Sequence, residues 1–162
     1  MLKIQQQKYK KLCGFSLLEV MVAMVIFSIG LLGLASLMAQ STRFNNSAQY
    51  RTQATYLAYD ILDRMRANPD QAKNPTLNYN LSLGNTPGTA TCYNTTCSPA
   101  ELAAADKDQW LTAVQMLLPS GDGGVTLPNP DTNLVFVITI EWKDPVSAEG
   151  ADPTSFILRS EL

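Results

Sequence analysis

A short polar segment at the start of the chain gives way abruptly to a long apolar run. Of the 25 residues from Phe15 to Ala39, 19 are apolar, and the only charged one is Glu19. About 20 consecutive apolar residues in a helix are enough to cross the hydrocarbon core of a bilayer. The pattern therefore predicts a membrane-spanning helix over residues 15–39, with one carboxylate inside the apolar run.

After Ala39 the apolar residues recur at intervals of three and four, which is the spacing of one face of an α-helix. No proline occurs between Phe15 and Asn68, and the Asn68-Pro69 pair disfavours further helix. We therefore expect the same helix to continue as an amphipathic half over residues 40–67. The predicted stripe holds Phe44, Ala48, Arg51, Ala54, Leu57, Ala58, Ile61, Leu62 and Met65.

The remaining residues, 68–162, are predicted to form a small head that begins with a loop and a helix. Residues 70–97 are rich in Asn, Thr, Gly and Pro and predict a long loop. Ser98 at the N-cap, Pro99 at the first position and Glu101 at the third predict a helix over 99–118 with a capping box. Its apolar stripe is expected to hold Leu102, Ala105, Gln109, Val114 and Leu117. Asp106, Asp108 and Asp122 are expected to lie on solvated surface.

The end of the chain is predicted to form a small antiparallel sheet. Residues 124–127 suggest a short strand, and residues 134–142 alternate so that Phe136, Ile138, Ile140 and Trp142 share one face. Residues 155–161 are expected to pair with that second strand as a hairpin, across the loop from Asp144 to Pro153. The pattern predicts an α+β head in which the sheet packs on the amphipathic half of the long helix.

Composition and charge exclude several classes of function. Histidine is absent, which excludes a His-based catalytic triad and a His-ligated metal site. The serines of the apolar run have no base beside them, and Gly121-Asp122-Gly123-Gly124 lacks the Lys-Ser/Thr of a phosphate loop. We expect no enzyme, no cofactor, no metal and no small-molecule substrate. Residues 15–162 carry a net charge of −6, so nucleic acid is not expected as a direct partner.

A basic segment followed by an apolar run is compatible with several N-terminal signals. A conventional signal peptide has an apolar stretch of only about 7–15 residues before a small-residue cleavage site, and the run over residues 15–39 is too long for it. A lipoprotein signal places its cysteine after the apolar run, whereas Cys13 precedes it. A simple signal anchor fits the length but leaves Glu19 unexplained, because an unpaired carboxylate inside the membrane is costly.

The stretch Gly14-Phe15-Ser16-Leu17-Leu18-Glu19-Val20, after a lysine-rich leader and before an apolar run, resembles the class III signal of type IV pilins and pseudopilins. Ser16 stands where Thr is commoner. The resemblance implies that residues 1–14 are a leader, removed between Gly14 and Phe15 by the prepilin peptidase, and that the new Phe15 amine is N-methylated. It also implies a type IV pilin-like α+β fold, with a long N-terminal spine helix and a small head of one further helix and an antiparallel sheet.

Within that family, Glu19 has a natural assembly role. The amine of a neighbouring subunit's Phe15 could pair with the Glu19 carboxylate, which would remove two desolvation penalties and set the register between helices. The alternative is that Glu19 reaches the cytoplasmic headgroups. The basic residues Lys8, Lys10 and Lys11 favour a cytoplasmic leader. We expect a single-pass protein of the bacterial inner membrane with a periplasmic head, which moves to the pilus surface on assembly.

Once the leader is cut, Cys13 leaves and Cys92 and Cys97 remain as an even pair. In an oxidising periplasm this spacing predicts a small-loop disulfide. A zinc site would need two further ligands, and no His or other Cys is present to supply them.

Three segments resemble the PilV group of minor pilins. They are Ile29 to Leu34 in the apolar run, Leu62 to Asn68 at the end of the long helix, and Cys97 to Ala103 with Asp108-Gln109-Trp110 in the next helix. The resemblance implies a minor pilin that takes part in priming pilus assembly in or near the tip. Its partners would be other minor and major pilins and a large tip adhesin. The alternatives are a minor pseudopilin of a type II secretion system and, of another class, an adhesin or DNA-binding pilus module.

Overall fold

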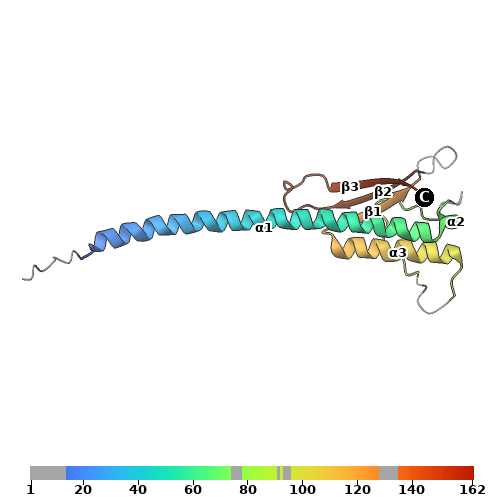
Figure 1. The fold of residues 1–162 in the computed structure, drawn as a ribbon, viewed down its shortest axis with the longest axis horizontal. Coiled ribbons are helices and arrows are strands. Elements are labelled where there is room, and N and C mark those ends of the chain that lie inside the picture. Colours follow the sequence, from blue (N-terminus) through green and yellow to red (C-terminus); the bar gives the residue numbers. More distant parts are fainter. Residues whose placement is uncertain (1–13, 74–77, 91, 93–95, 128–134) are drawn as a thin grey trace, which may run out of the picture. The chain divides into compact units, whose positions relative to one another are not determined.

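The computed structural model describes residues 14–73, 78–90, 92, 96–127 and 135–162 (Figure 1). Along the chain these residues form helix α1 (Leu17–Ala67), helix α2 (Pro69–Ala72), helix α3 (Pro99–Leu117) and strands β1 (Asp122–Thr126), β2 (Val135–Trp142) and β3 (Thr154–Glu161). The chain divides into two compact units, Met1–Ser41 and Thr42–Leu162. Each unit is described by itself.

In the first unit, the described residues are almost all helix and are exposed on every side. The large apolar side chains from Leu17 to Met38 remain exposed, by 72% at Leu32 for example. Ser28 donates its hydroxyl to the carbonyl of Met24, so this polar group is satisfied inside the helix. By length and composition α1 is able to cross a membrane, and among the described residues it is the one helix that is.

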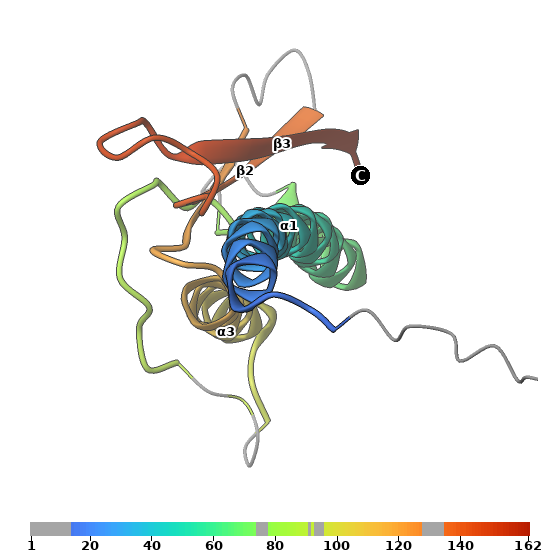
Figure 2. The ribbon, with the colours of Figure 1, turned by 90° about the vertical axis from the view of Figure 1, so that its left-hand side faces the viewer.

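In the second unit, α1 lies between the sheet and α3, as the view in Figure 2 shows. Its buried residues are Ser47, Ala54, Leu57, Ala58, Ile61, Leu62 and Met65. The indole nitrogen of Trp110 in α3 donates to the carbonyl of Leu57 in α1 at 2.8 Å. This bond joins the two helices at the centre of the core, where Trp110 is fully buried.

The sheet is antiparallel with the strand order β1-β2-β3. As predicted, Phe136, Ile138, Ile140 and Trp142 of β2 are buried, while the residues between them are only half-buried. Leu81 extends the β1 edge by a single bridge, exchanging two backbone hydrogen bonds with Val125. The alternation therefore sets which face of the sheet packs on the helices.

Several expectations about the second unit need correction. Residues 69–72 form the short helix α2 rather than loop, because Pro69 is tolerated at a first helical position. Strand β1 begins at Asp122 and ends at Thr126, and Leu134 lies outside the described residues. At the start of the amphipathic stripe, Phe44, Ala48 and Arg51 are exposed.

The buried stripe of α3 also differs from the predicted one. Leu102 and Leu117 are exposed, while the helix buries Ala103, Ala105, Asp106, Trp110, Leu111 and Val114. Asp106 is therefore a core residue and not a solvated one. The physical reason is that polar partners from other segments surround its carboxylate.

Candidate functional site

Two residues with a proposed role in processing, Gly14 and Phe15, lie before the first turn of α1. Both are exposed, and the Phe15 side chain is 84% exposed. A Cβ added at Gly14 would meet no atom within 4 Å, and the backbone there does not adopt a positive φ. Nothing in the described fold therefore requires glycine at position 14, so a requirement for it would have to come from a partner such as a peptidase.

Glu19 lies in the first turn of α1, where an acidic side chain interacts favourably with the helix dipole. The helix hydrogen bonds begin at the Ser16 carbonyl, which accepts from the Glu19 and Val20 amides at 3.0 and 3.3 Å. Phe15 and Glu19 line the same shallow groove of about 550 Å³ with the apolar side chains of Val20, Ala23, Met24 and Phe27. Among the described residues, no cation pairs with Glu19. The carboxylate is therefore free to meet a group from outside the described chain.

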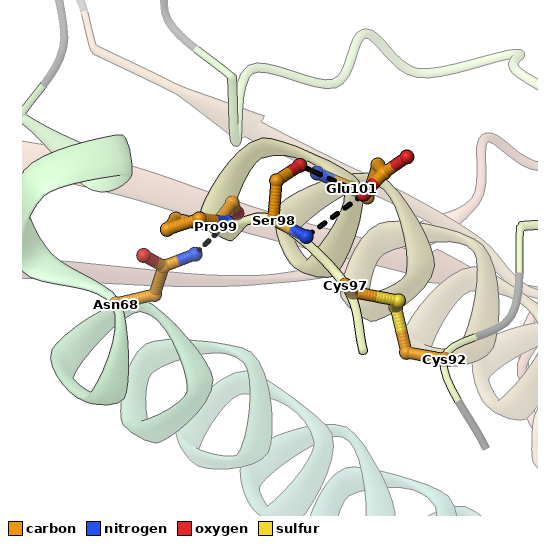
Figure 3. Close-up of a disulfide and its surroundings, with 6 residues drawn as sticks. All are labelled: Asn68, Cys92, Cys97, Ser98, Pro99 and Glu101. Atoms are coloured by element: carbon orange, nitrogen blue, oxygen red, sulfur yellow. Dashed lines mark hydrogen bonds between the residues drawn. A yellow bond between two sulfur atoms is a disulfide. The ribbon is translucent and has the colours of Figure 1, made fainter. Parts of the chain in front are cut away.

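In the head, a disulfide joins Cys92 to Cys97 directly before α3, with 5.9 Å between the Cα atoms (Figure 3). The next residue, Ser98, caps α3 and forms the predicted capping box with Glu101. The Glu101 carboxylate accepts from the backbone amide and the hydroxyl of Ser98, both at 2.8 Å. These bonds lower the pKa of the Glu101 carboxyl below its usual value. The disulfide and the cap together fix the start of α3.

A buried polar cluster, which we call the Asp106 cluster, connects the end of α1 to α3. The Tyr79 hydroxyl donates to Asp106 at 2.6 Å, and Arg64 donates to Asp106 at 3.2 Å. Asn68 donates to the Tyr79 hydroxyl at 3.3 Å and to the Pro99 carbonyl at 2.8 Å. Through these bonds one carboxylate connects three segments that are distant in the sequence.

The electrostatics of this cluster follow from its burial. Burial raises the pKa of the Tyr79 phenol, and the hydrogen bond to the Asp106 carboxylate raises it further. Burial alone would lower the pKa of Arg64, but its hydrogen bonds and charge attraction to Asp60 and Asp106 raise it overall. Tyr79 thus stays neutral and Arg64 stays charged over the physiological range.

The predicted site residues therefore fall into separate places. Gly14, Phe15 and Glu19 lie together at the start of α1, whereas Cys92 and Cys97 lie in the head. Among the described residues, no group of three or more His, Cys, Asp or Glu side chains could hold a metal ion. The Asp106 cluster was missed by the sequence reasoning. The positions 103, 106, 110 and 114 do follow helical spacing, and this is the signal that could have placed Asp106 on the buried stripe.

Comparison with known protein families gives two consecutive matches. The family model of the prokaryotic N-terminal methylation motif matches residues 9–35. The model described as type IV pilin Tt1218 matches residues 36–108. No curated protein and no solved structure matches the chain.

The chain is therefore similar to type IV pilins over residues 9–108, where the methylation motif leads directly into a Tt1218-like pilin region. Type IV pilins are structural and not enzymatic proteins. The long helix α1, helix α3 and the three-stranded antiparallel sheet agree with a type IV pilin-like α+β fold. The methylation motif and the apolar start of α1 are consistent with inner-membrane anchoring of a prepilin.

Proposed function

We propose that this protein is a minor pilin of the PilV type, which takes part in priming the assembly of a type IV pilus and is incorporated in or near the pilus tip. The observation that carries the proposal is the continuous match from the methylation motif into a pilin region, with Glu19 in register in the first turn of α1. The partners would be prepilin peptidase, other minor and major pilins and a large tip adhesin.

Two of the segments that resemble PilV proteins are in contact, which supports the narrower assignment. Asn68, at the end of the segment from Leu62 to Asn68, donates to the carbonyl of Pro99 in the segment from Cys97 to Ala103. Arg64 donates to Asp106 and to Gln109, which follow in the same helix. Motifs that form one contact network are a stronger basis for resemblance than motifs scattered over the surface.

In the proposed processing, prepilin peptidase removes residues 1–14, and the Phe15 amine is methylated. The exposed Gly14-Phe15 junction outside α1 is accessible to such an enzyme. The Glu19 carboxylate then pairs with the Phe15 amine of a neighbouring subunit, because two buried charges that pair avoid the larger cost of two unpaired ones. Before assembly the subunit crosses the inner membrane once, with residues 40–162 in the periplasm.

The test is the intact mass and N-terminal sequence of the native protein, measured separately from membranes and from sheared surface filaments. We expect a methylated Phe15 start in both fractions and two hydrogens missing for the disulfide. A chain that starts at Met1 in membranes, or near Gln40 in the medium, would overturn the assignment. A processed chain that is absent from the filaments of a piliated strain would instead favour a pseudopilin of a type II secretion system.

Replacing Glu19 by Ala tests the assembly role separately from processing. We expect normal cleavage of Glu19→Ala, with a loss of about tenfold or more from the filament fraction, because the interhelical charge pair is gone. Glu161→Ala, which removes an exposed carboxylate of β3, is the matched control. Equal incorporation of both variants would refute the pairing.

The alternative of a DNA-binding module finds little support, because the chain after residue 14 has a net charge of −6. Neutralising Arg43, Arg51, Arg64 and Arg66 together is expected to leave DNA binding unchanged.

A further inference from the structure

A cleft of about 500 Å³ lies at the beginning of the second unit, within the size range of small-molecule sites. Three segments line it. Arg43 and Tyr50 come from α1, Pro119 follows α3, and the loop after β2 contributes Lys143, Asp144, Pro145, Ser147, Ala148 and Glu149. We call this cleft the Arg43 cleft.

The walls of the Arg43 cleft are held together by a buried carboxylate. The Asp144 side chain is 3% exposed and accepts from the Ser47 hydroxyl at 2.7 Å and from the Val146 amide at 3.0 Å. Arg51 lies 3.8 Å from the same carboxylate. The Lys143 amide donates to the Pro119 carbonyl at 2.8 Å. The loop is thus fixed to both other walls, and the charge of Asp144 is satisfied inside the protein.

The remaining charges of the cleft are of both signs. Arg43, Lys143 and Glu149 are exposed, and none of them has an ion pair among the described residues. The cleft therefore offers two cations and one carboxylate to a ligand, in a chain whose residues after position 14 are net acidic. A ligand that joins a phosphate to an ammonium group would match this pattern better than a plain anion.

Chain connectivity limits how far Arg43 can lie from the apolar run. Arg43 follows Ala39, the last residue of the apolar run, by four positions. A fully extended residue spans at most about 3.6 Å, so Arg43 lies within about 14 Å of Ala39 whatever the orientation of the head. The interfacial layers add about 5–8 Å on each side of the hydrocarbon core. With Ala39 at the edge of the hydrocarbon core, Arg43 is at most about 6–9 Å beyond the headgroup layer, a distance that its long side chain largely covers.

We propose that the Arg43 cleft binds the headgroup of phosphatidylethanolamine on the periplasmic leaflet. Arg43 and Lys143 bind the phosphate, because their cations form charge-assisted hydrogen bonds with its oxygens. Glu149 binds the ammonium group. The proposal rests on the membrane-anchored state of the proposed function, and assembly into a filament would empty the cleft.

The experiment uses the full-length processed chain in a neutral detergent and counts bound lipid by native mass spectrometry. The probes are dihexanoyl phosphatidylethanolamine, the corresponding phosphatidylglycerol and inorganic phosphate. We expect phosphatidylethanolamine to bind about fivefold or more tightly than phosphatidylglycerol, because only the first can pair with Glu149. Inorganic phosphate is expected to bind more weakly than either lipid.

Two variants separate the two halves of the cleft. Arg43→Gln with Lys143→Gln is expected to weaken the binding of both lipids about tenfold or more. Glu149→Gln is expected to remove the preference for phosphatidylethanolamine and to leave phosphatidylglycerol binding unchanged. Lys73→Gln with Arg159→Gln removes two exposed cations elsewhere in the head and is expected to change neither.

Equal lipid binding by Arg43→Gln with Lys143→Gln and by the control pair would overturn the proposal. Phosphate binding as tight as lipid binding would define a free-anion site and would also overturn it. So would a Glu149→Gln variant that keeps the lipid preference. An unprocessed chain in cells would refute the proposed function but would not change lipid binding in detergent, so the two proposals fail independently.

Discussion

Removal of the Asp106 carboxylate should destabilise the head more than removal of any exposed acid. Asp106 is 8% exposed and accepts a 2.6 Å hydrogen bond from Tyr79, which is itself 1% exposed. Asp106→Ala leaves the Tyr79 hydroxyl buried without its charged acceptor. The unsatisfied donor should lower the free energy of unfolding by about 3 kcal/mol. Arg64 adds less than about 1 kcal/mol, because its side chain is 30% exposed and keeps its bond to Asp60 at 3.1 Å.

The assay is urea unfolding of the full chain in neutral detergent, followed by the fluorescence of the buried Trp110 and Trp142. Asp106→Asn keeps an oxygen acceptor and should cost only about 1 kcal/mol. The matched control is Asp63→Ala, since the side chain of Asp63 is 70% exposed and pairs with an exposed arginine of the same helix. We expect the control to change the free energy of unfolding by less than about 0.5 kcal/mol.

A double-mutant cycle with Tyr79→Phe isolates the hydrogen bond itself. Because the two side chains are in direct contact, the cycle should give a coupling energy of about 1–2 kcal/mol. If Asp106→Ala costs no more than the Asp63→Ala control, or if the coupling energy is zero, the Asp106 cluster does not stabilise the head and the reasoning is refuted.

Three further predictions concern other parts of the head. Replacing Cys92 and Cys97 by Ser should lower the free energy of unfolding by about 2 kcal/mol, because the bond closes a short loop in the unfolded chain; no change on adding reductant to the native protein would contradict this. The pKa of the Glu101 carboxyl in the folded protein lies below its ordinary value of 4.5. Its contribution to the free energy of unfolding should therefore be present above pH 4.5 and vanish as the pH falls through the lowered pKa. A constant stability difference between wild type and Glu101→Gln over that range, measured by urea unfolding, would be inconsistent with the capping box. Gly123→Ala should cost about 1–3 kcal/mol, because the new Cβ would lie 2.6 Å from the Trp110 ring, and an unchanged thermal midpoint would show that the ring moves away freely.

The elements that could be predicted are those whose pattern is decided by neighbouring residues. Strand β2 alternates because one face packs on the core, and the alternation is visible in Phe136, Ile138, Ile140 and Trp142 themselves. The start of α3 is likewise local, because Ser98 and Glu101 satisfy each other across one turn. Such features need no knowledge of the rest of the fold.

The Asp106 cluster could not be predicted in the same way, because it depends on contacts between distant segments. A carboxylate is buried only when partners satisfy it, and the partners of Asp106 are 27 residues away at Tyr79 and 42 residues away at Arg64. Tyr79 belongs to a segment that the sequence described only as a loop. When Tyr79 is not known to be a partner, the polar side chain of Asp106 argues against a place on the buried stripe. The prediction that Leu102 and Leu117 lie on that stripe is wrong for the same reason.

The apolar half of α1 places a physical limit on how such a subunit can assemble. Its side chains are exposed in the isolated chain, so lipid or neighbouring helices must cover them. Lipid tails are as apolar as the side chains of a neighbouring helix, and the hydrophobic effect therefore does not distinguish the two environments. It also cannot fix how far one helix slides along another, because all positions of the run are similarly apolar. Under the proposed function, the information must come from the one charge in the run. A pairing of Glu19 with a neighbour's Phe15 amine would supply both the preference for the filament over the membrane and the register of the helices within it.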